Sequence, residues 1–270
     1  MKRLNFRYHL EIDFDIPVKE HRFTLKCIPY SNSVQQVESL KYNIVPNYFL
    51  CRTKDSFENE SIYGSCDKEH NVFSVDVWGN LKTGLSEKIE MRTSYEADIY
   101  KYQTEHTKPG EELKKYSEEL KKGYKKQFVK EDILKKAIFY MHRLYEDYTY
   151  ESGITEITTT AEEAFKIGKG VCQDYSHILI ALLRMERIPC RYVTGMMLGE
   201  GYSHAWIELC DGNFWIAIDP TNDLIVKDCH IRIAVGRDYK DCMINQGVFI
   251  GCGREAKQRQ DISVTVEEIK

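Results

Sequence analysis

Hydrophobic and polar residues alternate with a period of two along the first hundred positions. The stretch NFRYHLEIDF places apolar side chains at every second residue, namely Phe6, Tyr8, Leu10, Ile12 and Phe14. Such alternation is typical of half-buried β-strands. The stretches FTLKCIP, SLKYNIVP and NVFSVDVWGN, and the alternation of Ile89, Met91, Thr93 and Tyr95, predict more strands. We therefore predict an N-terminal β-sandwich domain over residues 1–105.

The period changes to that of a helix after the breaker sequence at residues 107–110. Apolar residues recur at helical spacing at Leu113, Tyr116, Leu120, Tyr124 and Phe128. The i,i+4 pairs Glu111–Lys115 and Glu118–Lys122 indicate that the opposite, lysine-rich face is solvated. A second helix is predicted at about residues 130–147, burying Ile133, Leu134, Ala137, Ile138, Met141 and Leu144. A third begins after Thr160, an N-cap candidate.

A fourth helix, from Cys172 to about Glu186, is apolar nearly all round and should lie in the middle of the fold. The stretches CRYVTGM, SHAWIEL, FWIAIDP, HIRIAVG and DISVTVEE predict strands after it. The fold class is therefore α+β, with a second domain over residues 106–270.

Composition excludes several classes of partner. The 270 residues carry a formal net charge of -4, which favours neither nucleic acid nor an anionic membrane. The first residues alternate charged and apolar side chains instead of forming a signal peptide, so we expect a cytoplasmic protein. Nine cysteines without a CxxC pair are expected to be mostly free thiols. The sequence does not indicate an oligomeric state.

Cys172 is the first candidate for chemistry. A cysteine at a helix N-terminus has its thiolate favoured by the helix dipole and the unpaired backbone N–H groups. Gly168 and Gly170 before it allow a tight approach. A buried cysteine that opens a core helix can also be simply a small apolar residue. Position alone therefore does not distinguish a nucleophile from a packing residue.

A predicted hairpin supplies two partners for Cys172. Asp211-Gly212 is a two-residue hairpin signal between strand-prone stretches. If these two residues form the turn, His204 lies directly opposite Asp219 on the same face. An imidazole that takes the thiol proton and a carboxylate that orients the ring are what thiol catalysis requires.

Several motifs in this order resemble the transglutaminase-like superfamily, and specifically its bacterial branch of cysteine peptidase-like proteins: GVCQDYSHILIALLRMERIPCRYVTG, SHAWIEL, WIAIDPTND, HIRIAVGRDYKD and GVFIGCG. The resemblance implies a papain-like core, with a central helix on an antiparallel sheet, preceded by a β-domain. It also implies a Cys172–His204–Asp219 triad that forms a thioester from a peptide or isopeptide amide. We expect hydrolysis rather than cross-linking of protein glutamines, a protein or peptide substrate, and no cofactor or metal.

Five further residues are candidates for supporting roles. The oxyanion of the tetrahedral intermediate should bind the Cys172 N–H and a second donor, for which Tyr150 and Gln173 are candidates. Asp174 and His177 are expected to tie the helix to the sheet. Trp206 lies on the His204 face of its strand, where it could line the cleft or pack in the core.

Other classes of function stay open at this point. The chain could be a non-catalytic binding module that retains the fold, although the triad residues are all present. A metal site at Cys229, His230, Cys242 and Cys252 is disfavoured, because the spacings do not match those of zinc ligands. The zinc-binding cysteine pairs of glycan-releasing amidases and the calcium loops of animal transglutaminases have no counterpart in this sequence.

Overall fold

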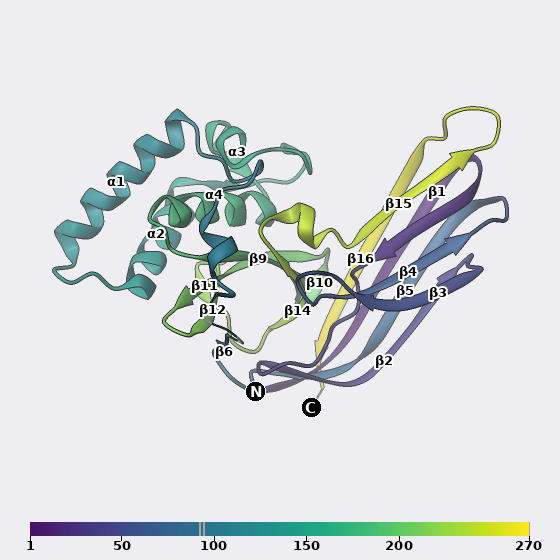
Figure 1. Ribbon diagram of the computed structural model, residues 1–270, viewed down its shortest axis with the longest axis horizontal. Helices are drawn as coiled ribbons and strands as arrows, with labels where there is room; N and C mark the ends of the chain where they lie inside the picture. The colour runs from purple at the N-terminus through teal and green to yellow at the C-terminus, as the bar shows by residue number, and fades with distance from the viewer. Residues whose placement is uncertain (92, 94, 270) are drawn as a thin grey trace.

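The computed structural model describes residues 1–91, 93 and 95–269. These residues form two large antiparallel sheets, a two-stranded parallel sheet and four α-helices, and Figure 1 shows the helices gathered on one side and the long strands on the other. The prediction of an α+β fold is confirmed. None of the described helices is long and apolar enough to span a membrane.

The larger sheet is built around one long strand, β1 (Lys2–Leu25). On one side, the first part of β1 pairs with β5 (His70–Thr83), and its last residues pair with β4 (Glu60–Cys66). On the other side, the first part of β1 pairs with β16 (Gln258–Glu268), and its second part pairs with β15 (Asn245–Gly251). The strands β2 (Gln35–Val45), β3 (Phe49–Lys54) and β10 (Gly199–Gly201) complete this sheet at its edges.

Two features of this sheet differ from the prediction. The strands form one continuous, curled sheet instead of two separate layers, because both halves of β1 pair on both sides. The C-terminal strands β15 and β16 also belong to this sheet. Residues 1–105 therefore do not contain all of its strands. The predicted strand from Ile89 to Tyr95 is short: β6 covers Ile89–Glu90, residues 95–97 form a turn, and positions 92 and 94 lie outside the described residues.

The smaller sheet, which we call the core sheet, has the order β13-β12-β11-β9-β14, with β6 also on β12. Its strands are β9 (Cys190–Met197), β11 (His204–Asp211), β12 (Phe214–Asp219), β13 (Leu224–Ile225) and β14 (His230–Gly236). The helix α4 (Cys172–Met185) packs against β11 and β9. Its residues from Ile178 to Leu183 are fully buried, as predicted for a central helix.

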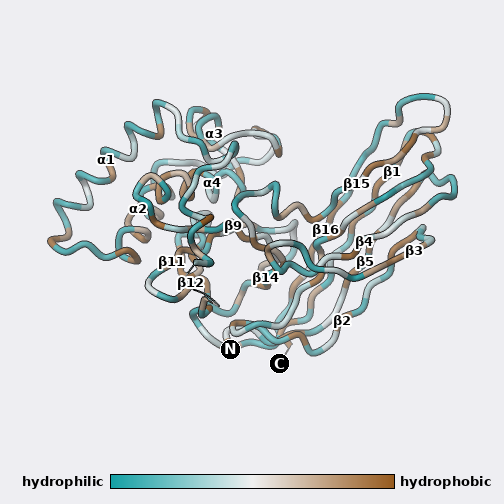
Figure 2. Tube along the Cα trace, viewed as in Figure 1, coloured by the Kyte–Doolittle hydropathy of each residue, from teal (hydrophilic) through white to brown (hydrophobic). Residues whose placement is uncertain are grey.

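The other helices cover α4 from outside. They are α1 (Glu111–Gln127), α2 (Ile133–Asp147) and α3 (Ala161–Ile167), with short 3-10 turns at Asp98–Lys101 (η1) and Tyr239–Cys242 (η2). Thr160 caps α3 as predicted, accepting from the Glu163 amide. The outer helix α1 is largely hydrophilic in Figure 2, which agrees with a solvated lysine face.

Two details of the helices were predicted wrongly. The ion pairs on α1 have i,i+3 spacing, as in Glu112–Lys115 (2.8 Å) and Glu118–Lys121 (3.0 Å), instead of i,i+4. Ile133 is exposed, because α2 begins at that residue and its first turn projects beyond the core.

Candidate active site

Cys172 is the first residue of α4 and follows the two-residue strand β8 (Lys169–Gly170). The Asp174 carboxylate fixes this start, since its Oδ2 accepts from the Val171 amide (2.8 Å) and from Thr155 Oγ1 (2.7 Å). A side chain at Gly170 would meet Asp174 Oδ2 at 2.3 Å, so only glycine fits there. Asp174 therefore positions the helix terminus on which Cys172 sits, and its partners lie in the segment before α4 instead of in the sheet to which it was expected to tie the helix.

Cys172 and His204 line one cavity of about 260 Å³ between the two sheets. One wall is lined by residues of α4, of β9 and of the neighbouring loops, namely Ile157, Gln173, Tyr192, Thr194 and Tyr239. The opposite wall is lined by residues of the larger sheet, namely Tyr8, Asn245, Gln260 and Ile262. No Asp, Glu, Lys or Arg is found among the described residues that line this cavity. The larger sheet thus forms one wall of the site, with uncharged side chains.

The β11–β12 hairpin has a different register from the one predicted. Asp211 pairs with Phe214, so the turn is Gly212-Asn213, with Gly212 at φ 61°. Glycine at the first central position of a hairpin turn is favoured because it adopts positive φ without steric cost. The predicted turn at Asp211-Gly212 is therefore wrong by one residue, and the pairing is displaced by two.

His204 and Asp219 are nevertheless in contact, because a displacement of two residues keeps both side chains on the same face. Extending the register puts Asp219 level with Trp206, so His204 is its diagonal neighbour. The distance from His204 Nε2 to Asp219 Oδ2 is 2.7 Å. This contact leaves Nδ1 as the ring nitrogen that can serve Cys172.

His204 is mostly buried, which by itself lowers its pKa, but hydrogen bonding to Asp219 and to Cys172 outweighs burial and raises the pKa to about 10. Asp219 shows the complementary effect. Burial favours its neutral form, but the hydrogen bonds from His204, His230 and Asn222 outweigh the effect of burial and hold its pKa below the usual range. The geometry therefore favours an imidazolium–carboxylate pair beside the thiol.

Asp219 is the most heavily bonded side chain of the site. Its Oδ2 accepts from His204 Nε2, from Asn222 Nδ2 (2.7 Å) and from His230 Nε2 (3.0 Å). Its Oδ1 accepts from the amides of Thr221 (3.0 Å) and Asn222 (3.3 Å). Apart from His204, these donors were not predicted from the sequence. The PTND stretch after Asp219 was a signal for the turn amides, whereas His230 comes from a strand whose place in the sheet no local pattern predicts.

Trp206 packs behind the histidines instead of lining the cavity. Its ring stacks on His204 (centroids 6.1 Å apart) and meets the His230 ring edge-on at 5.1 Å. The backbone of Gly195 lies directly against the indole. Of the two roles considered for Trp206, the structure supports the core role.

The two candidate oxyanion donors have different surroundings. Tyr150 pairs with Gly170 through β7 (Thr149–Tyr150), and burial followed by the charge of Cys172 raises the pKa of its hydroxyl. A protonated hydroxyl near the thiol can donate to an oxyanion. The Gln173 amide instead donates to the Ile157 carbonyl (3.2 Å), which ties the preceding loop to α4. Gln173 lines the cavity, whereas the exposed Tyr150 is not among the described residues that line it.

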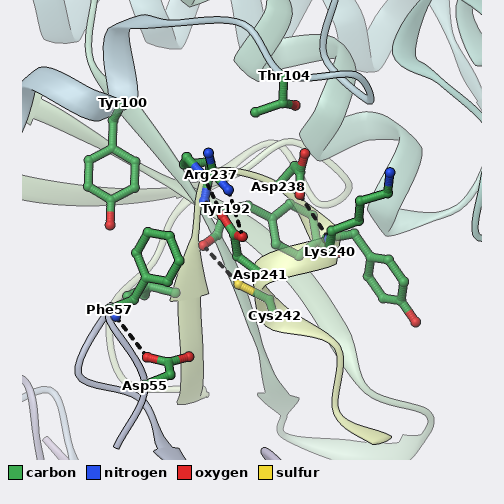
Figure 3. A network of polar contacts seen from close by, with 12 residues as sticks. Asp55, Phe57, Tyr100, Thr104, Tyr192, Arg237, Asp238, Lys240, Asp241 and Cys242 are labelled. Carbon is green, nitrogen blue, oxygen red and sulfur yellow. Dashed lines mark hydrogen bonds and ion pairs between the residues drawn. The ribbon is translucent and has the colours of Figure 1, made fainter. Parts of the chain in front are cut away.

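The loop after β14 is held by a network of polar contacts that includes Arg237 and Asp241 (Figure 3). Arg237 contacts both carboxylate oxygens of Asp241, at 2.8 and 3.1 Å. The Tyr239 amide donates to Nε2 of His177 on α4 (3.1 Å). These contacts hold η2 against α4 and so place the Tyr239 ring at the cavity. The expected role of His177 as a tie between helix and sheet extends to this loop.

Three side chains of the site are of types that can bind a metal ion. Within the described part of the chain, the group whose ligand atoms lie close enough to share an ion, within 4.8 Å, is His204, Asp219 and His230. Their contacts are hydrogen bonds, and the Asn222 amide donates to the same carboxylate oxygen. Cys229, Cys242 and Cys252 do not join this group.

Comparison with known proteins gives two family matches. Residues 114–220 match the transglutaminase-like superfamily, and residues 4–81 match the bacterial transglutaminase-like N-terminal region. The chain therefore combines a transglutaminase-like core with a bacterial transglutaminase-like N-terminal region, as the motifs predicted.

A solved structure has the same fold. The crystal structure of a candidate cysteine protease from Cytophaga hutchinsonii superposes with a TM-score of 0.79 at 20% sequence identity, covering 100% of this chain and 92% of that one. At this identity the likeness shows the fold alone.

Mycobacterial proteins are also similar in sequence. An uncharacterized protein of Mycobacterium leprae is 37% identical over 128 residues, which is 44% of this chain and 44% of that protein. One from Mycobacterium tuberculosis is 36% identical over 123 residues, 40% of this chain and 39% of that protein. The chain thus matches less than half of the length of these curated relatives.

Proposed function

We propose that the protein is a thiol-dependent acyl-transfer enzyme that acts on peptide or isopeptide amides, with Cys172 as nucleophile, His204 as acid and base, and Asp219 as orienting acid. The observation that carries this proposal is that Cys172 opens α4 at the same cavity as His204, whose other ring nitrogen contacts Asp219 at 2.7 Å. A partly exposed Cys172 at a cavity argues against a module with a blocked cleft.

Acylation starts from the Cys172 thiolate and the His204 imidazolium. The Cys172 thiolate attacks the amide carbonyl carbon, and the resulting oxyanion is stabilised by the Cys172 N–H, which has no partner within the helix, and by Tyr150. His204 gives its Nδ1 proton to the leaving amine, and the C–N bond breaks. The product is a thioester on Cys172, with Asp219 still ionised.

Deacylation reverses these roles. The neutral His204 accepts a proton from water while the water oxygen attacks the thioester carbonyl, and the C–S bond breaks. The acid leaves, and the thiolate–imidazolium pair is restored. An amine in place of water gives transamidation, which requires a second site that excludes water. We favour hydrolysis.

The cavity wall supports a polypeptide substrate presented through uncharged groups. Asn245 and Gln260 offer amides, and Ile157 and Ile262 offer apolar contacts. The nine free cysteines support a reducing compartment such as the cytoplasm.

The test is acylation by p-nitrophenyl acetate, an activated ester that any competent thiol site accepts. We expect a burst of nitrophenol and one acetyl group on Cys172, seen by intact-protein and peptide mass spectrometry, with both absent in Cys172→Ala. Added amine should then reveal whether water or amine takes the acyl group. If parent protein and Cys172→Ala react equally slowly, the thiol mechanism is wrong.

A further inference from the structure

His230 is a second imidazole at Asp219, and its ring centroid lies 5.6 Å from that of His204. Its Nε2 is 3.0 Å from Asp219 Oδ2, the oxygen that also contacts His204, and the His230 side chain is 2% exposed. It belongs to β14, which is separated from β11 by β9. The sheet therefore brings a second imidazole to the carboxylate from a separate strand.

We propose that His230 is a positioning residue that donates a hydrogen bond to Asp219, keeps that carboxylate ionised, and thereby holds His204 as the cation that pairs with the Cys172 thiolate. This inference rests on the proposed function and adds a fourth residue to its catalytic machinery. His230 does not line the cavity that holds Cys172, so it acts through Asp219 alone.

Asp219 is fully buried. A buried carboxylate stays charged only if donors replace its lost hydration. If one donor is lost, the His204 proton moves towards Asp219, giving a neutral acid beside a neutral imidazole. The thiolate then loses its counter-ion, so the effect of His230 is expected at Cys172.

The tautomer of His230 follows from its surroundings. With the Nε2 proton donated to Asp219, Nδ1 is an acceptor, and in the described structure it has no partner. Trp206 Nε1, a donor, is unpartnered as well. Both side chains line a separate small cavity of about 30 Å³, enough for a water that accepts from Trp206 and donates to His230. Such a water would hold the proton on Nε2.

Other charged groups around His230 do not compete for this role. Four of them line the small cavity, namely Glu87, Glu208, Lys227 and Arg232. Glu208 is ion-paired with Arg232 (3.1 Å) and with Arg191 (2.7 Å). Asp219 is the carboxylate that contacts the His230 ring.

The experiment compares His230→Leu, which removes the donor, with His230→Gln, whose amide can restore it. The readout is the rate of Cys172 alkylation by iodoacetamide against pH. We expect roughly tenfold slower labelling of His230→Leu at pH 6, with its acid limb moved to higher pH, and recovery in His230→Gln. His106→Leu is the matched control, since His106 is also buried (3% exposed) but packs on His177 instead.

The outcomes separate the two proposals. Fast labelling of the parent at pH 6 with an unchanged profile in His230→Leu overturns the role of His230 and leaves the proposed function standing. Slow labelling of the parent itself overturns the proposed function. A loss shared by His106→Leu, or by His230→Gln, means that only core packing was disturbed, which also overturns the inference.

A second measurement uses only the parent protein, so it does not depend on whether a variant folds. Imidazole ¹H–¹⁵N correlation spectra of the parent should show His230 as the Nε2-protonated tautomer, with its proton shifted downfield by the bond to Asp219. A His230 signal with the proton on Nδ1 contradicts the proposal.

Discussion

His204 and Asp219 meet as diagonal neighbours across the β11–β12 hairpin, with Nε2 and Oδ2 2.7 Å apart. Asp219 in turn is bound by two backbone amides and by the side chains of Asn222 and His230. The imidazole is thus oriented by a carboxylate that cannot itself rotate.

Replacing Asp219 with Asn should abolish most activity with little change of fold. The amide can fill the same space but cannot hold the imidazolium, so we expect a fall of about 10²–10⁴-fold in the acylation rate with p-nitrophenyl acetate. Asp223→Asn is the control, because Asp223 contacts His142 (2.7 Å) instead. Equal losses in the two variants would mean that Asp219 has no special role.

The stability contributed by His204 should depend on pH. Its pKa is raised from 6.5 to about 10 in the folded protein, so its contribution is fully present below pH 6.5 and is lost as the pH rises towards 10. We expect the gap in unfolding free energy between parent and His204→Gln to narrow over this window, as measured by urea denaturation. A gap that widens with pH would contradict the raised pKa.

The stability contributed by Asp219 should depend on pH in the opposite sense. Its pKa is depressed in the folded protein, so its contribution is present above the unfolded value near 3.8 and is lost as the pH falls below it. Urea denaturation of parent and Asp219→Asn from pH 6 to pH 3 should show the two stabilities converging on acidification. A constant difference over that range would argue against an ionised Asp219.

Glu208 should be critical for folding although it is not part of the triad. It is 2% exposed and binds both Arg191 (2.7 Å) and Arg232 (3.1 Å). Removing its charge leaves two buried guanidinium groups without this anion, so Glu208→Gln should destabilise the protein by about 3–5 kcal/mol. The control Glu118→Gln breaks an exposed pair with Lys121 and should leave the unfolding free energy almost unchanged. Similar losses in chemical denaturation would refute the distinction.

Gly170→Ala should disturb the start of α4. The added Cβ would lie 2.3 Å from Asp174 Oδ2 and 2.5 Å from the Tyr148 hydroxyl, so the capping carboxylate must move. We expect slower acylation of Cys172 together with a lower melting temperature. Unchanged acylation would show that the position of Cys172 does not depend on this cap.

Local chemistry allowed much of the site to be predicted from sequence. The apolar helix after Cys172 and the parity of the β11–β12 pairing are local patterns, so Cys172, His204 and Asp219 could be named together. The exact turn could not, because Asp211-Gly212 and Gly212-Asn213 are both acceptable turns. The choice between them depends on side-chain packing across the hairpin.

The remainder depends on long-range pairing. His230 reaches Asp219 only because β14 lies beside β9, and β15 and β16 reach the cavity only because they pair with β1. Alternation along the chain indicates a strand but not its neighbour. The larger sheet's contribution to the cavity wall therefore required the structure.

The most direct test of the central claim is the pH dependence of iodoacetamide alkylation of Cys172, followed by peptide mass spectrometry in the parent and in His204→Ala. Exposed Cys51 in the same molecule serves as the reference thiol. We predict labelling of Cys172 that persists well below the ordinary thiol pKa of about 8.5 and is lost in His204→Ala. Labelling that follows the profile of Cys51 in both proteins would contradict a thiolate–imidazolium pair.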